Sequence, residues 1–184
     1  FRNAVASYVS GNWGNGGAYG PIEQWCTKDI TNMAALFFNQ AGFNADISEW
    51  DTSSVTDMQQ MFAVATSFNQ NLSDWDTSKV KTMNAMFQAA MAFNGDVGGW
   101  DTSSVENMTN MFSYAAAFNR DVSQWDISSV AQMKSMFQMA STFNQFLCPW
   151  KFDFPFGDAS KGIFLNSGCQ YKDDPMSGSS SFCD

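Results

Sequence analysis

The chain has 184 residues, with nine Lys and Arg against eighteen Asp and Glu, so its formal net charge is −9. This acidic balance argues against nucleic acid and anionic membrane surfaces as partners, because both require a basic patch. Histidine is absent, which excludes Ser-His-Asp and Cys-His nucleophile pairs as well as His-based zinc sites. Eighteen Phe and seven Trp, with only 15% charged residues, indicate a folded chain with much apolar surface to bury.

Residues 1–24 are rich in Gly and Asn and lie outside the repeats described below. We expect them to form an N-terminal cap on the first repeat, or an arm that reaches a neighbouring molecule. Because the sequence starts at Phe1 and not at Met, we expect a processed product or a partial chain. No apolar run approaches the roughly 20 residues of a bilayer span, so no membrane insertion is predicted.

Residues 25–149 contain five repeats of 25 residues. Val, Met, Phe and Asn recur in phase with tryptophan, as in the pair Met61-Phe62 and its copy Met86-Phe87. The large apolar columns are interpreted as a continuous core and not as a cofactor site. The predicted tryptophan core column is Trp25, Trp50, Trp75, Trp100, Trp125 and Trp150.

Each repeat is predicted to hold one helix and one short strand. In the second repeat Val55, Met58, Met61, Phe62 and Ala65 have the spacing of one helix face, and residues 47–51 alternate like a strand. One helix and one strand cannot bury their apolar faces alone, so identical units must stack. The predicted fold class is α/β: a leucine-rich-repeat-like solenoid of strand-helix coils with short parallel strands.

The repeat F-N-x-D-[IL]-S-x-W-D-T-S-x-V-x-x-M-x-x-M-F, clearest over residues 43–144, resembles the BspA-like leucine-rich repeats of microbial and algal surface proteins. The resemblance implies an exported protein used for adhesion or surface structure. It also implies that the cysteine-containing end of the chain is a C-terminal cap. Residues 150–184 are accordingly expected to form a degenerate sixth coil followed by this cap.

Two polar columns accompany the core. The asparagines are expected to form a hydrogen-bonded ladder that satisfies backbone groups of adjacent coils. The aspartates are expected to accept local N–H groups in Asx turns, with Ca²⁺ binding a less favoured alternative and catalysis the least favoured. The ladder comprises Asn44, Asn69, Asn94, Asn119 and Asn144, and the aspartate column comprises Asp51, Asp76, Asp101 and Asp126.

Hydroxyl groups suggest two kinds of modification or binding. A row of Thr52, Thr77 and Thr102 could form a flat surface for ice or O-linked sugars, although Ile127 interrupts it. Two N-x-[S/T] sequons begin at Asn71 and Asn107, and Asn107 is the better glycosylation candidate if it faces solvent.

The four cysteines indicate an oxidising compartment. Cys148 and Cys169 are about one coil apart, so a bridge between them fits the geometry, and a Cys169–Cys183 pair is the alternative. Cys26 lies at the far end of the stack. It either stays reduced and buried, or it forms an intersubunit disulfide with the leftover cysteine, Cys183 or Cys169, of a neighbouring copy.

These features predict a non-enzymatic extracellular or cell-surface protein without cofactors, because no asymmetric set of acid, base and nucleophile is present. The leading hypothesis is a structural subunit of a filament or surface layer, assembled head-to-tail as a homopolymer. The alternative is an adhesion module that binds a protein or glycan on its repeat face.

Overall fold

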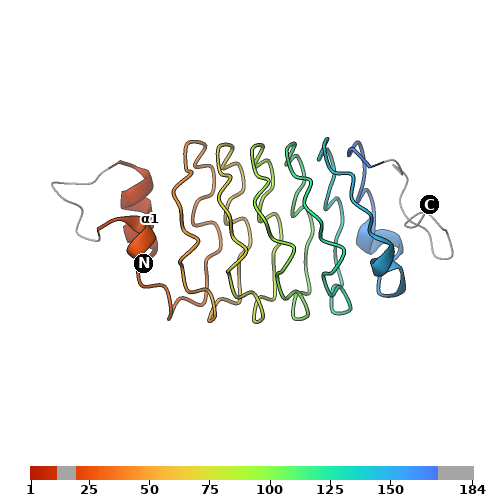
Figure 1. Cartoon of the computed structure of the whole chain (residues 1–184), viewed down its shortest axis with the longest axis horizontal. Coiled ribbons are helices and arrows are strands. Elements are labelled where there is room, and N and C mark those ends of the chain that lie inside the picture. Colours follow the sequence, from red (N-terminus) through yellow and green to blue (C-terminus); the bar gives the residue numbers. More distant parts are fainter. Residues whose placement is uncertain (12–19, 170–184) are drawn as a thin grey trace.

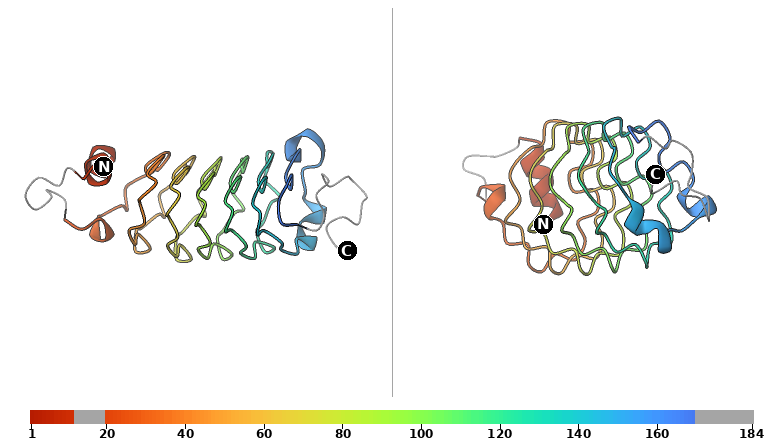
Figure 2. Two further views of the ribbon diagram at one scale, coloured as in Figure 1. Left: turned by 90° about the horizontal axis from the view of Figure 1, so that it is seen from above. Right: turned by 45° about the vertical axis from the view of Figure 1, so that its right-hand side comes forward.

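The computed structural model describes residues 1–11 and 20–169. Its repeats form a stack of 25-residue coils along one long axis (Figure 1). Helix α1 (Arg2–Val9) lies at the N-terminal end of the stack (Figures 1 and 2). The short 3-10 helix η1 (Ile22–Gln24) precedes the repeats, η2 (Cys148–Phe152) begins at the end of the fifth repeat, and η3 (Gly157–Ser160) follows. We number the coils from the first (25–49) to the fifth (125–149).

The predicted α/β solenoid of strand-helix coils is wrong. In the described ranges, no helix falls between residues 25 and 147, and no extended strand or sheet is formed. Parallel pairing is confined to isolated bridges, one per coil boundary: Asn32–Asp57, Asp57–Thr82, Thr82–Asn107 and Asn107–Gln132.

Successive tight turns replace the predicted helix. Met61 N–H closes a turn on the Met58 carbonyl at 3.2 Å, whereas Phe62 N–H donates to Met86 O in the next coil at 2.9 Å. Along this segment, N–H groups alternate between local turns and the neighbouring coil. Gln60 adopts a φ of 55°, in the left-handed region that a right-handed helix excludes.

The coil spacing explains why no helix forms. The rings of Phe62 and Phe87, one coil apart, have centroids separated by 5.4 Å. An α-helix with its side chains is about 10 Å wide, so helices could not stack at this rise. The i, i+3, i+7 spacing of buried residues is shared by a helix face and by a series of i→i+3 turns, and it therefore misled the prediction.

An uninterrupted column of stacked phenylalanine rings fills the core. Within a coil, Phe87 and Phe93 stack at 3.8 Å, and between coils Phe87 and Phe112 stack at 5.6 Å. Beside this column, Trp100 stacks on Trp75 at 6.4 Å and donates its indole N–H to Leu72 O at 2.8 Å. Five of the six predicted core tryptophans are buried, the exception being Trp25, which is only half-buried at the N-terminal end.

Helix α1 covers the first coil. Val5 is buried, and Phe1 packs edge-on against Trp25 and Trp50 with centroid distances of 6.1 and 5.6 Å. Arg2 donates to the Ala34 carbonyl, one of the backbone acceptors that the first coil presents toward this end. The N-terminal face of the stack is therefore closed by the chain itself.

After the fifth coil the core continues for one more layer. Phe137 N–H donates to Ile163 O at 2.9 Å, and Phe164 stacks on Phe137 at 5.9 Å. Ile163 and Phe164 thus occupy the place of a Met-Phe pair, and Phe154 is buried beside them. Cys169 ends the described part of the chain, so the expected cap beyond it, including Cys183, lies outside the described residues.

Candidate binding surfaces

The asparagine ladder runs along the stack, one residue per coil. The side-chain oxygen of Asn69 accepts the backbone N–H of Asn94 at 2.8 Å, and that of Asn94 accepts the N–H of Asn119 at 3.0 Å. The same bond links Asn44 to Asn69 and Asn119 to Asn144, each at 2.9 Å. The ladder uses only the amide oxygens in these bonds, and most of its side chains are exposed.

The aspartate column forms Asx turns. The Oδ1 atom of Asp51 accepts the Ser53 hydroxyl at 2.6 Å and the Ser53 N–H at 3.0 Å. The hydroxyl bond, followed by the backbone bond, holds the pKa of Asp51 below its ordinary value. The corresponding serine bonds likewise lower the pKa of Asp76 and Asp126. Asp101 makes the same two contacts with Ser103.

These aspartates belong to a larger acidic edge, formed by residues 46–51, 71–76, 96–101 and 121–126. Half of the chain's eighteen acidic residues lie there, all exposed and with no Lys or Arg inside the segments. Its carboxylates recur in successive coils, and the rings of the buried Trp100 and Trp125 in the same segments lie 6.3 Å apart. The members are Asp46, Glu49, Asp51, Asp74, Asp76, Asp96, Asp101, Asp121 and Asp126.

Within residues 1–11 and 20–169, no group of three or more His, Cys, Asp or Glu side chains is placed to hold a metal ion. The acidic edge is therefore a row of separate carboxylates, each tied to its own turn, and not a preformed Ca²⁺ cage.

The threonine row is buried and presents no hydroxyl surface. Thr52 and Thr77 are about 2% and 1% exposed, and Thr52 Oγ1 donates to the Asp76 carbonyl at 3.0 Å. A surface for ice or O-linked sugars on this row is thus wrong. The hydroxyls link neighbouring coils instead.

The two sequons differ in accessibility. Asn71 is exposed, and its side-chain nitrogen donates to the Ser73 hydroxyl at 3.1 Å. Asn107 is half-buried in a bridge between coils, and the Thr109 hydroxyl is buried with no partner in the described part of the chain. The structure therefore reverses the preference for Asn107.

The predicted Cys148–Cys169 bridge is not formed, because Cys169 is a free thiol. Its burial raises the pKa of this thiol, which disfavours the reactive thiolate. Cys26 is also free, but it is exposed and not buried as one hypothesis required.

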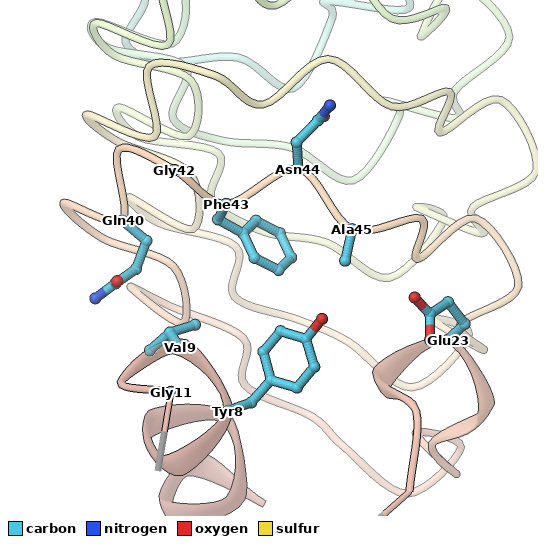
Figure 3. Close-up of a pocket in the computed structure, with 9 residues that line it drawn as sticks. All are labelled: Tyr8, Val9, Gly11, Glu23, Gln40, Gly42, Phe43, Asn44 and Ala45. Atoms are coloured by element: carbon cyan, nitrogen blue, oxygen red, sulfur yellow. The ribbon is translucent and has the colours of Figure 1, made fainter. Parts of the chain in front are cut away.

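A hollow of about 670 Å³ lies between α1, the segment at Glu23 and the first coil (Figure 3). The hydroxyl of Tyr8 points into the space between Glu23 and Ala45 (Figure 3). Partial burial, followed by the charge of Glu23, raises the pKa of Tyr8. Sequence reasoning missed this hollow because it exists only where α1 packs on the first coil. Its lining is Tyr8, Val9, Gly11, Glu23, Gln40, Gly42, Phe43, Asn44 and Ala45.

The repeats also decide which family the protein falls in. The sequence matches the family described as "Mycoplasma protein of unknown function, DUF285" over residues 8–100 and 75–155, which is more than half of the chain. The chain belongs to this family. No curated protein and no solved structure matches it significantly. The DUF285 match supports the repeat architecture of a family without an assigned function, and it does not confirm the narrower BspA-like resemblance.

No helix in the described part of this DUF285 chain is long and apolar enough to cross a membrane.

Proposed function

We propose that this chain is a non-enzymatic extracellular repeat module, of the BspA-like surface-protein kind, that binds a protein or glycan of another cell along its acidic edge. The observation that carries the proposal is the regular row of exposed carboxylates along the stack of coils. A repeated group at constant spacing can engage a repeated ligand at several points, so that weak single contacts add up to useful avidity.

The charge of this edge favours a positively charged ligand. The chain carries a net charge of −9, and half of its acidic residues are concentrated in the four segments of the acidic edge. Hydrogen bonds from serine lower the pKa of Asp51, Asp76 and Asp126, so these carboxylates stay ionised to a lower pH than an ordinary Asp. Basic protein segments or aminosugar-containing glycans are the matching chemistry, and salt should weaken their binding.

The head-to-tail filament is less well supported than adhesion. Open repeat ends invite addition of further copies, but α1 closes the N-terminal end here, with Val5 buried and Arg2 bonded to Ala34 O. A filament in which one copy's coils stack directly on the next copy's first coil would require α1 to leave that coil. Negative-stain electron microscopy of the native material, with and without reductant, distinguishes filaments from single particles.

Binding to immobilised basic polypeptides and to a glycan array tests the adhesion proposal. We expect saturable binding that weakens as salt rises from about 0.05 to 0.5 M. An Asp96→Asn/Asp121→Asn variant removes two charges from the acidic edge and leaves the aspartate column (Asp51, Asp76, Asp101 and Asp126) unchanged. This variant should bind more weakly than the native chain. The control Asp57→Asn/Asp158→Asn removes the same number of charges outside the edge. Equal binding by the edge variant and the native chain would contradict the proposal.

A further inference from the structure

A second edge of the stack carries no charge at all. The segments between the paired phenylalanines of the five coils, 37–43, 62–68, 87–93, 112–118 and 137–143, contain no Asp, Glu, Lys or Arg, and neither does 164–169. Charged residues make up 15% of the whole chain, and all of them lie outside these segments. The segment 62–68, for example, begins eleven residues after the acidic segment 46–51 and ends three residues before the acidic segment 71–76. We call the uncharged segments together the uncharged edge.

Large apolar side chains are exposed on the uncharged edge. Met91 is 54% exposed, Phe38 47%, Tyr114 46%, Leu165 45% and Met139 37%. They come from five different layers of the stack, so together they make a strip along it and not an isolated patch. Such a strip on a protein surface is a feature of interaction sites.

The backbone under this strip adopts a left-handed conformation once in every coil. Val64, Tyr114 and Met139 occupy equivalent positions with φ of 62°, 61° and 60°. This left-handed conformation suits Gly or Asn, and the first coil does place Asn39 there, with φ of 59°. Tyr114 and Met139 are 46% and 37% exposed, so burial within the fold accounts for only part of their bulk. Their side chains are better explained by a contact outside the chain.

A second copy of the chain is the occupant that fits this strip. Two chains of charge −9 repel each other, and the uncharged segments are the part of each coil where a contact sets no charged residue of one copy against the other. Both copies also have the same rise, 5.4–5.7 Å between consecutive phenylalanine layers, so their side chains match at every coil. A two-fold arrangement brings identical strips together and closes the assembly as a dimer.

The size of the strip sets the strength of the contact. Six layers at this rise make it roughly 28 Å long. With a width of about 10 Å, each copy would bury on the order of 300 Å², well below the roughly 800 Å² of a standard interface. We propose that two copies associate weakly and reversibly through their uncharged edges.

Sedimentation velocity from about 5 to 500 µM, in reductant so that Cys26 forms no disulfide, tests this proposal. The native chain should shift from monomer toward dimer as concentration rises. A Tyr114→Lys/Met139→Lys variant should dimerise at least about tenfold more weakly, although its net charge is less negative and general repulsion is reduced. The control Gln124→Lys/Ser129→Lys makes the same charge change at exposed positions away from this edge and should dimerise like the native chain.

Calorimetric melting of each variant verifies folding, and the single variant Met91→Lys tests the same edge at an ordinary backbone position. A native chain that stays monomeric throughout the range would overturn the proposal. So would a dimer that survives in the edge variants, or one that is lost equally in the control. Adhesion would be unaffected by any of these results, since its test measures binding along the acidic edge.

Discussion

The contribution of a single indole hydrogen bond to the stability of the stack can be measured by replacing Trp with Phe. Trp100 is 4% exposed and donates to Leu72 O at 2.8 Å, and Trp125 donates in the same way to Val97 O at 3.0 Å. Trp150 is equally buried, but its indole N–H has no partner in the described part of the chain. A Trp→Phe change therefore removes a hydrogen bond at two of these positions and only an unpaired donor at the third.

The expected costs follow from this difference. Leaving the Leu72 carbonyl without its donor costs about 1–3 kcal/mol, and the smaller ring leaves a void worth about 1 kcal/mol more. Trp100→Phe and Trp125→Phe should each destabilise by roughly 2–4 kcal/mol, which lowers Tm by roughly 5–15 °C in a chain of this size. Trp150→Phe should cost about 1 kcal/mol or less, because the void is partly offset by loss of the unpaired donor.

Differential scanning calorimetry is the suitable assay, since it does not rely on the tryptophan fluorescence that the substitutions change. Trp125→Phe serves as the positional control, because its coil lies next to Trp150. Equal losses of Tm for Trp125→Phe and Trp150→Phe would refute the reasoning, since ring size alone would then account for both.

Three further predictions concern a close approach, a modification and acidity. Gly95→Ala should destabilise by about 1–3 kcal/mol, because its Cβ would lie 2.3 Å from Gln70 O, whereas Gly99→Ala, with nothing within 4 Å, should leave the calorimetric Tm nearly unchanged. When the chain is secreted from a eukaryotic host, glycosidase treatment should increase its gel mobility. Asn71→Gln should abolish this shift and Asn107→Gln should not. Asp46, Asp51, Asp76 and Asp126, whose pKa is lowered by bonds from serine, contribute stability above the ordinary value of 3.8. The Tm should therefore fall as pH drops below that value, and alanine at the serine partners of Asp51, Asp76 and Asp126 should flatten the fall.

The period of the repeat and its core columns could be predicted from sequence, because identical residues stacked at one spacing leave a visible periodicity. Phe62, Phe87 and Phe112 are buried as one column, as their recurrence indicated. The local structure of each coil could not be predicted in this way. A run of i→i+3 turns buries Val55, Met58 and Phe62 at the same spacing as a helix, so the pattern alone does not distinguish the two.

The polar columns show a similar division. The Asx turns at Asp51 follow from short-range chemistry between a carboxylate and the serine two residues later. The burial of Thr52, however, depends on a carbonyl 24 residues away, at Asp76, which local sequence does not place. The hollow beside Tyr8 and the cover formed by α1 depend on how residues outside the repeat meet the first coil.

Backbone N–H groups in each coil bond either to a local turn or to the neighbouring coil, and this arrangement affects how the molecule responds to force. A coil such as 50–74 contains no helix that would hold its shape alone, so a coil detached from the end of the stack becomes extended chain. In the stack it occupies about 5.5 Å of length, the spacing between successive phenylalanine rings. Its 25 residues span roughly 80–90 Å when stretched. Tension applied between the two ends would therefore detach the coils one at a time, and each detached coil would become more than ten times longer. A single-molecule pulling experiment should record a series of extension steps of equal length, one for each repeat.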